Sequence, residues 1–469
     1  MSSKDKKCYL IQNRELLADE TPDSLKNLSY GIYPDSKSYN DNRFIYNKIF
    51  NYFPLAIYYV RNYQDISYLI KQFVANNSKF TIRCGGHAYE PASLSSGFII
   101  DVKNINGIKI DKINKTAKIG SGTKLGAIVD VLSKYKMTTS LGDSSCVGIS
   151  GLSLAGGKGF LTRLYGMVCD NIISIQAVNY EGKLIKIDKN NYPDLLWAYK
   201  GAGICNFGVV YEIEMKLYND IYAQLEDITW DWNADNVKNV LKIYQKWILE
   251  IPDNITSDIN LMYNNGTATF TIKFYKYGEC VKNHNFDEIN CFKEYGNPTV
   301  SICKGYFSQI SDCWVNYDTG KSQPFSKMKS TMIFKPNYSD EYLSIYTDSI
   351  ERLIESKLNV VFQYNFTQVG GKVSDGNSCY FPKDAIIALT IFCTWGTENL
   401  TNCCRNFTNF QTEKITKYTS KYVFPNMIDY DLDDYMDSYY GCNKNKLIEI
   451  KNKYDPNNVF NWNQSIPLH

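Results

Sequence analysis

The chain has 469 residues, 44% of which are hydrophobic, and a formal net charge of +2. Its length allows two to four domains, and its apolar content is that of an ordinary globular protein. The small net charge excludes the strongly basic surface that nucleic-acid binding requires, so no nucleic-acid partner is expected. The longest apolar run, residues 385–393, fits a buried strand and is too short for a membrane span.

Residues 1–7 carry charge, but no apolar stretch follows them. We therefore expect no secretory signal, and a protein that is intracellular or packaged. The 14 cysteines are scattered along the chain, which favours reduced, buried thiols over a disulfide framework. No cysteine and histidine spacing matches a metal site, so no metal is expected. None of these features indicates an oligomeric state.

The first half of the chain alternates strand and helix patterns. Residues 1–40 are polar and irregular and are predicted to form a partly ordered arm. Strands are predicted at residues 55–60, 79–82, 97–101 and 116–119. Helices are predicted from Asn62 onward, with Ile66, Leu69, Ile70 and Phe73 on one face, and at residues 126–135. Such alternation indicates an α+β fold.

A pair of glycines follows the strand predicted at residues 79–82. Gly85 and Gly86 let the backbone take positive φ and approach a ligand closely. Successive backbone N–H groups in such a turn can cradle phosphate oxygens, and Arg83 adds positive charge. The next residue, His87, is one of only three histidines in the chain. Taken alone, a Gly-Gly-His turn is more often a tight loop than a site.

Two further glycine-containing blocks favour a ligand site over a simple tight loop. Residues 148–159 are so rich in glycine that neither a regular helix nor a regular strand is expected, and the backbone there should pass close to something flat or charged. Residues 192–210 combine a short helix, a tight glycine turn and an outgoing strand. They include the runs Pro193-Asp194-Leu195-Leu196-Trp197-Ala198 and Asn206-Phe207-Gly208-Val209-Val210.

The pattern of predicted elements changes after Tyr218. Residues 236–250 predict a helix with Val240, Leu241, Tyr244 and Ile248 on one face, and residues 267–276 alternate like a strand. This order suggests an antiparallel sheet covered by helices.

These blocks, with the tail that ends Gln464-Ser465-Ile466-Pro467, resemble the vanillyl-alcohol-oxidase/PCMH superfamily, specifically its berberine-bridge-enzyme-like branch. The match covers about half of the chain. The resemblance implies a PCMH-type FAD-binding domain of two subdomains and a substrate domain with an antiparallel sheet under helices. The implied boundaries are an arm at 1–40, the FAD domain at 41–218, the substrate domain at 219–425, and a segment at 426–469 that returns to the FAD domain.

The resemblance also implies the cofactor, FAD, and its contacts. His87 takes the position of a histidine that is bonded covalently to the flavin. The pyrophosphate would be surrounded by Arg83, Cys84, Gly85, Gly86, Ala88 and Ser93. The dinucleotide would be lined by Gly148, Gly151, Gly156, Gly157, Gly159, Asn206, Phe207 and Val209, with Asn461 near the ring. Many members add a second bond from a cysteine; Ser144 stands at that position here, and Cys146 is the nearest alternative.

The implied chemistry is hydride transfer from an alcohol or sugar-type substrate to FAD, with O₂ restoring the flavin and forming H₂O₂. Val147 matches a position where a small residue admits oxygen, which favours an oxidase over a dehydrogenase with another acceptor. The family commonly uses a base in a Tyr-X-Asn-Tyr segment. The comparable segment is taken as Tyr422-Val423-Phe424-Pro425, which lacks the Asn and the second Tyr.

Three side chains are therefore considered for the catalytic role: Tyr422, Tyr364 and Gln363. A glutamine is a poor base, and a tyrosine would need a desolvated site. The missing pattern keeps open a second hypothesis, a structural or scaffold protein that retains flavin without its substrate chemistry.

Overall fold

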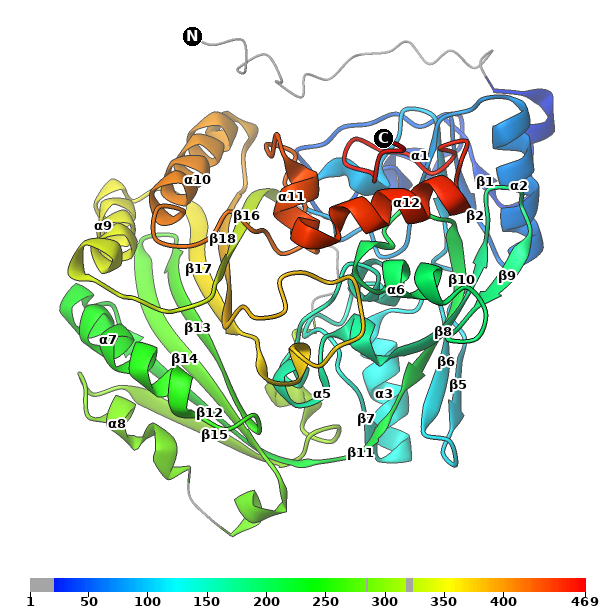
Figure 1. Ribbon diagram of the computed structural model, residues 1–469. Helices are drawn as coiled ribbons and strands as arrows, with labels where there is room; N and C mark the ends of the chain where they lie inside the picture. The colour runs from blue at the N-terminus through cyan, green and yellow to red at the C-terminus, as the bar shows by residue number, and fades with distance from the viewer. Residues whose placement is uncertain (1–20, 284–285, 318–323) are drawn as a thin grey trace.

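The computed structural model describes residues 21–283, 286–317 and 324–469. Two bodies lie side by side in Figure 1. One contains the blue-to-teal first half of the chain together with its red C-terminal end, and the other contains a large sheet with helices on its outer side. The mixture of helices and sheets confirms the α+β fold predicted from the sequence.

The first body begins with a four-stranded sheet in the order β1-β2-β4-β3. Its strands are β1 (Gly31–Ile32), β2 (Ala56–Tyr59), β3 (Phe80–Arg83) and β4 (Phe98–Asp101). Strands β2, β4 and β3 run parallel, and α2 (Tyr63–Ala75) buries the four side chains predicted for its inner face. The side chain of Asn62 caps this helix by accepting a hydrogen bond from the backbone N–H of Asp65.

Part of the predicted N-terminal arm, residues 21–40, belongs to the first body. Residues 1–20 lie outside the described residues, as does the expectation about a secretory signal, but residues 21–40 contribute β1, which pairs with β2, and the start of α1 (Tyr39–Asn42). Leu25 is fully buried in the core of this sheet. Burial of apolar groups therefore ties this segment to the first body.

The second sheet of this body is antiparallel, in the order β5-β6-β10-β8-β9. Its strands are β5 (Ile108–Asp111), β6 (Thr116–Gly120), β8 (Ile172–Val178), β9 (Leu184–Ile187) and β10 (Val209–Lys216). The same body contains α3 (Leu125–Tyr135), α4 (Ile149–Ser153), α5 (Thr162–Tyr165) and α6 (Pro193–Ala202), of which α6 contacts β8 and β9. Strand β7 (Met137–Thr138) pairs with β11 (Tyr218–Asn219). Helix α4 corrects the prediction that residues 148–159 contain no regular helix.

The second body is built on a seven-stranded antiparallel sheet in the order β15-β12-β14-β13-β17-β18-β16. Its strands are β12 (Tyr222–Asp231), β13 (Ile255–Asn264), β14 (Thr267–Tyr277), β15 (Thr299–Tyr306), β16 (Phe325–Ile333), β17 (Val360–Gln368) and β18 (Ile387–Trp395). Helices α7 (Ala234–Glu250), α8 (Asn290–Lys293), α9 (Asp340–Ser356) and α10 (Thr401–Ile415) lie on its outer side (Figure 1). The opposite face is turned toward the first body.

The chain then returns to the first body through α11 (Tyr435–Tyr440) and α12 (Lys444–Tyr454), with α12 against α6. Lys451 on α12 is fully buried and donates to the backbone carbonyls of Asn206 (2.8 Å) and Phe460 (2.7 Å) while pairing with Asp455 (2.6 Å). This one amine fastens the C-terminal segment to the glycine-rich block at residues 201–210.

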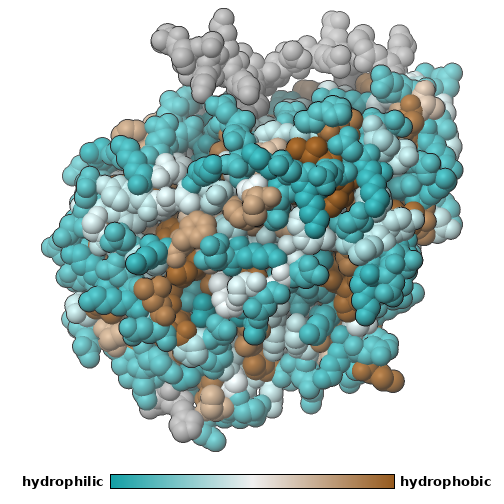
Figure 2. Space-filling view, in the orientation of Figure 1, coloured by the Kyte–Doolittle hydropathy of each residue, from teal (hydrophilic) through white to brown (hydrophobic). Residues whose placement is uncertain are grey.

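The structure also describes the cysteines and the molecular surface, and it shows that two of the cysteines are bonded to each other. Cys303 and Cys313 form a disulfide, which corrects the expectation that all thiols are reduced. The face shown in Figure 2 is mainly hydrophilic, with brown apolar patches distributed among teal residues. Within residues 21–283, 286–317 and 324–469, no helix has the length and apolar character of a membrane span, and no group of potential metal ligands is found.

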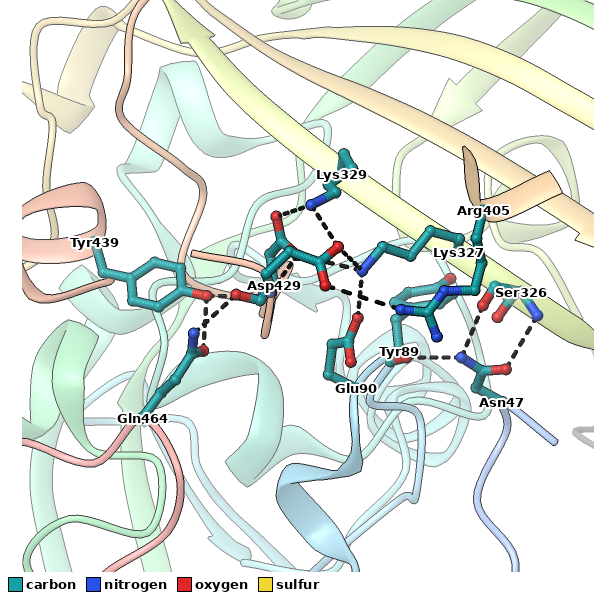
Figure 3. Close-up of polar contacts among 11 residues, drawn as sticks. Asn47, Tyr89, Glu90, Ser326, Lys327, Lys329, Arg405, Asp429, Tyr439 and Gln464 are labelled. Atoms are coloured by element: carbon teal, nitrogen blue, oxygen red, sulfur yellow. Dashed lines mark hydrogen bonds and ion pairs between the residues drawn. The ribbon is translucent and has the colours of Figure 1, made fainter. Parts of the chain in front are cut away.

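A buried cluster of charges joins three parts of the chain (Figure 3). Lys327 on β16 contacts Glu90, three residues beyond His87, at 2.7 Å, and Asp429 of the C-terminal segment at 3.2 Å. Lys329 contacts Asp429 at 2.6 Å and Asp431 at 2.9 Å. The side chains of Lys327, Glu90 and Asp429 are at most 4% exposed. Burial raises the pKa of Glu90, against the effect of Lys327.

We expect Lys327→Met to lower the free energy of unfolding by about 3–5 kcal/mol, because it leaves two buried carboxylates without their shared cation. Urea unfolding at neutral pH measures the change. Lys183→Met, which removes an exposed partner of Glu181, is the control and should leave the transition in place. A transition for Lys327→Met that matches the control would show that the cluster contributes nothing to stability.

Candidate active site

A cavity of about 290 Å³ lies where the first body meets the C-terminal segment. Its walls come from residues 82–93, 142–158, 203–210 and 424–428, with Val102 and Leu125 in addition. The inner face of the seven-stranded sheet lies over it, since Phe392 on β18 packs edge-on against the cavity-lining Tyr89, with ring centroids 5.3 Å apart. The backbone N–H of the cavity-lining Phe424 donates to Ser330 Oγ on β16.

Two of the glycine loops are in direct backbone contact at this cavity. A Cβ on Gly85 would stand 2.6 Å from the backbone nitrogen of Gly148, and a Cβ on Gly148 would collide with Cys84 Sγ. Gly86 has a φ of +68°, which side chains rarely adopt. The glycines are therefore required first for packing one loop against the other, and this contact brings His87 and Val147 to the same cavity.

Half of the predicted cofactor-binding residues line the cavity: Cys84, Gly85, Gly86, His87, Ala88, Ser93, Val147, Gly148 and Gly151. The imidazole of His87 stacks on Tyr46, with ring centroids 5.1 Å apart and an interplanar angle of 24°. The backbone N–H of Tyr46 donates to the carbonyl of Gly86, so residues near the start of the first body fix this turn from outside.

Arg83 lies in a buried ion pair directly before the glycine turn. Its guanidinium is buried and donates from Nε to Asp101 Oδ2 at 2.6 Å, and from Nη2 to the hydroxyl of Tyr59 at 3.3 Å. Its Nη1 is buried without a hydrogen-bond partner in the described protein, and Arg83 lines a second cavity of about 570 Å³ together with Gly85, Gly86 and His87. The phosphate contact that the resemblance implies for Arg83 therefore stays a prediction.

The later glycines pack against protein. Gly156 (φ +113°) lies against Tyr380, Gly157 (φ +75°) lies against Val168, and a Cβ on Gly159 would collide with the carbonyl of Leu141. None of these three glycines is part of the described cavity lining. Their role is to let the loop turn tightly beside bulky neighbours.

The remaining predicted contacts also lie outside the described lining. Asn206 is fully buried and accepts a hydrogen bond from the backbone N–H of Ile466 at 2.9 Å. Phe207 and Val209 are core residues, and the exposed Asn461 donates to the carbonyl of Asn458. From the same block, Ile204, Cys205, Gly208 and Val210 line the cavity in their place.

Ser144, not Cys146, lines the cavity. Cys146 is only 4% exposed, and its sulfur lies 3.4 Å from Ser144 Oγ. Ser144 therefore faces the cavity, whereas the sulfur of Cys146 is buried against the Ser144 hydroxyl.

The cavity has features that suit a large bound group. Gly151 lies in α4, where glycine costs about 1 kcal/mol relative to alanine, and a Cβ built there would meet no protein atom within 4 Å. The hydroxyl oxygen of Ser93 is buried at the cavity wall without a hydrogen-bond partner in the described protein. Open space beside a helix backbone and an unpaired buried hydroxyl fit the FAD that the sequence implies.

The catalytic candidates are placed in three different ways. Tyr364 is fully buried on the helix-covered face of the sheet, where its hydroxyl lies 2.8 Å from Ser349 Oγ, so it does not reach the cavity. Tyr422 packs edge-on against Phe381 and lies outside the described lining. Gln363 lies on the inner face, because its register partner across the sheet is Phe392.

The structure also corrects the alignment of the expected Tyr-X-Asn-Tyr segment. Phe424, Asn426 and Met427 line the cavity, so the pattern is occupied by Phe424-Pro425-Asn426-Met427. Its asparagine is retained: Asn426 accepts from the backbone N–H of Gly157 at 2.7 Å and donates to the carbonyl of Leu152 at 2.9 Å. Both tyrosines are replaced by residues that cannot accept a proton.

Sequence reasoning missed Lys158 and Asp143, which contribute charged side chains to the lining. The only signal for Lys158 was its place between Gly157 and Gly159, in a loop already chosen for its glycines. Nothing in the sequence indicated that the sheet of the second body would meet this loop.

Comparison with known proteins agrees with this geometry. The family model described as FAD binding domain matches residues 54–188, and the model described as Berberine and berberine like matches residues 423–467. The chain is 29% identical over 442 residues to the uncharacterized FAD-linked oxidoreductase YgaK of Bacillus subtilis, covering 92% of this chain and 95% of that protein. It is 31% identical over 226 residues to (R)-6-hydroxynicotine oxidase of Paenarthrobacter nicotinovorans, covering 48% of this chain and 49% of that protein.

Solved structures share the fold. BBE-like 1 of Physcomitrella patens superposes with a TM-score of 0.84 at 23% identity, covering 94% of this chain and 97% of that one. A chitooligosaccharide oxidase superposes with a TM-score of 0.81 at 20% identity, covering 93% and 96%. The class of protein follows from the two family-model matches and the FAD-linked relatives. The chain is an FAD-linked oxidoreductase of the berberine-bridge-enzyme-like branch of the PCMH family.

Gly151→Ala should separate stability of the protein from flavin binding. Alanine is the better helix former, by about 1 kcal/mol, so the flavin-free protein should unfold at the same or a higher temperature, whereas the added methyl group should reduce the FAD content of purified protein. Thermal melting and the ratio of visible to ultraviolet absorbance measure the two effects. Full flavin content in this variant would show that FAD does not pass beside α4.

Proposed function

We propose that this chain is an oxidase that acts on the CH–OH group of a small hydroxylated molecule, an alcohol or a sugar, with O₂ as the final acceptor and H₂O₂ as the product. The observation that carries the proposal is one cavity with His87 in its lining, against which the inner face of the sheet packs through the contact of Phe392 with Tyr89. That face presents Gln363, Asn365 and Thr390, whose amide and hydroxyl groups suit hydroxyl recognition.

Bound FAD would supply the two-electron acceptor, and the protein would supply position and a proton acceptor. His87 is the residue we propose to bond covalently to the flavin, held from outside by Tyr46. Val147 lines the cavity, at the position where the resemblance associates a small residue with oxygen as the acceptor. The fold is shared with a carbohydrate oxidase from Microdochium nivale (TM-score 0.83, 20% identity), which supports a sugar-type substrate.

One observation favours a second candidate function, a scaffold that retains flavin without turnover. Phe424 and Met427 occupy the places where the family pattern has tyrosines, so the expected base is absent from the described lining. A panel of sugars and alcohols, assayed for H₂O₂, distinguishes the two. Peroxide formation with any of them supports the oxidase. Flavin bleaching in the absence of air with slow recovery in air identifies a dehydrogenase, and no bleaching by any compound supports the scaffold.

The covalent bond is tested without a substrate. Acid-denatured protein should stay yellow, and its intact mass should exceed the chain mass by one FAD. His87→Ala should release all of its flavin on denaturation, whereas Cys146→Ala should keep it, because Cys146 is buried behind Ser144. Flavin retained through denaturation by His87→Ala would assign the bond to another residue.

A further inference from the structure

The glycine-rich loop places one amine in the cavity wall. Lys158 lines the cavity, and its Nζ donates to Thr367 Oγ1 on β17 at 2.5 Å. Thr367 lies on the inner face of the sheet, directly opposite Asp258 of β13 in the strand register. Lys158 therefore connects the wall of the cavity to the second body.

Behind the hydroxyl lies a carboxyl group. Thr367 Oγ1 is 2.7 Å from Asp258 Oδ2, and Asn365 Nδ2 donates to Asp258 Oδ1 at 2.6 Å. The three groups thus form a chain from amine to hydroxyl to carboxyl, which proton transfer along hydrogen bonds requires. Burial raises the pKa of the Asp258 carboxyl above its ordinary value, against the opposing effects of Lys158, Thr367 and Asn365.

The other ionisable side chains of the described lining suit the role less well. The thiols of Cys84 and Cys205 have pKa values raised by burial, to about 11 for Cys205. Asp143 is exposed, His87 is assigned to the flavin, and Tyr89 packs against Phe392. Lys158 lines the cavity, and its amine is joined by hydrogen bonds through Thr367 to Asp258.

We propose that Lys158 accepts the hydroxyl proton of the substrate, with Thr367 and Asp258 as the relay that keeps its amine able to do so; this rests on the proposed function. Lys158 can take this proton only as a neutral amine, and the hydrogen bonds through Thr367 give its own proton a path: it passes to the Thr367 oxygen while the Thr367 proton passes to Asp258. In the reaction the substrate O–H bond breaks and its proton goes to Lys158 Nζ. Bound FAD would accept the electron pair of the broken C–H bond as hydride, so that the substrate carbon and oxygen form a C=O bond.

Other titratable groups surround this relay. Asp143, on the cavity loop, raises the pKa of Asp258 further. Tyr275 on β14 is buried and has its own pKa raised by burial and by Asp258. Tyr244 on α7 donates or accepts at Ser257 Oγ, beside Asp258 in sequence. The pH dependence of the rate should therefore follow Lys158 and Asp258, and these neighbours should shift it only modestly.

The discriminating variants are Lys158→Arg and Lys158→Met. Arginine keeps the positive charge and the hydrogen bond but cannot be deprotonated in a protein. If Lys158 acts as a base, both variants should lower the rate of anaerobic flavin reduction by the substrate at least about 100-fold. Lys186→Met, at an exposed lysine of β9, is the control. A Lys158→Arg protein that reduces its flavin at the wild-type rate overturns the proposal.

Thr367→Val and Asp258→Asn test the relay. Each should move the rising limb of the pH–rate profile to higher pH, because Lys158 then loses its proton only to solvent. A purely structural role would lower the rate equally at every pH. Flavin content and thermal melting identify any variant that fails to fold, and Thr408→Val, in α10, is the matched control for loss of a buried hydroxyl.

A second readout does not depend on turnover. A small acylating reagent modifies only neutral amines, and peptide mass spectrometry gives the extent at each site. Lys158 of the flavin-loaded protein should be modified at lower pH than the exposed Lys186, and Asp258→Asn should remove the difference. Modification of Lys158 no earlier than Lys186, or none at all, overturns the proposal. If the wild type oxidises none of the panel but shows this pattern, the proposed function fails and the amine relay stands.

Discussion

The structure of the site depends on one backbone contact, between Gly85 and Gly148. These residues come from loops more than sixty positions apart, and no side chain fits between them. Their contact holds the His87 turn against the loop of Ser144 and Val147, which produces a single cavity. The two glycine clusters are therefore two halves of one packing interaction, and a cofactor would bind in the space beside it.

The position of the seven-stranded sheet beside the cavity depends on buried ion pairs. Lys327 and Lys329 of β16 hold Glu90 from the His87 loop and Asp429 from the C-terminal segment (Figure 3). Asp429 directly follows the cavity-lining residues 424–428. Because the four side chains are buried together, a shift of any one body relative to the others would expose unpaired charge, which is costly. The cluster thus fixes where the sheet lies relative to the cavity.

This arrangement explains how the site can lose two tyrosines and keep its architecture. Asn426 keeps the segment in place through two backbone hydrogen bonds to the glycine-rich loop, independently of Phe424 and Met427. The same loop carries Lys158, whose amine faces the threonine and carboxylate of the opposing sheet. A proton acceptor contributed by this loop would stand at a different wall from the one the family pattern uses.

The sequence by itself determined the fold class, the cofactor family and most regular elements, because period and glycine spacing are local properties. Helices α2 and α7 bury the faces that their spacing predicted, and the His87 turn lies at the cavity as its glycines indicated. Only the tertiary structure decided which glycines face open space and which face protein: Gly151 faces open space, whereas Gly156 lies against Tyr380. It also decided that Arg83 pairs with Asp101, that Tyr364 points to the helices, and that Lys158 is linked to Asp258 through Thr367. Those outcomes depend on which strand, distant in the sequence, lies opposite each side chain. The residue pattern of one segment does not specify its neighbours in the folded chain.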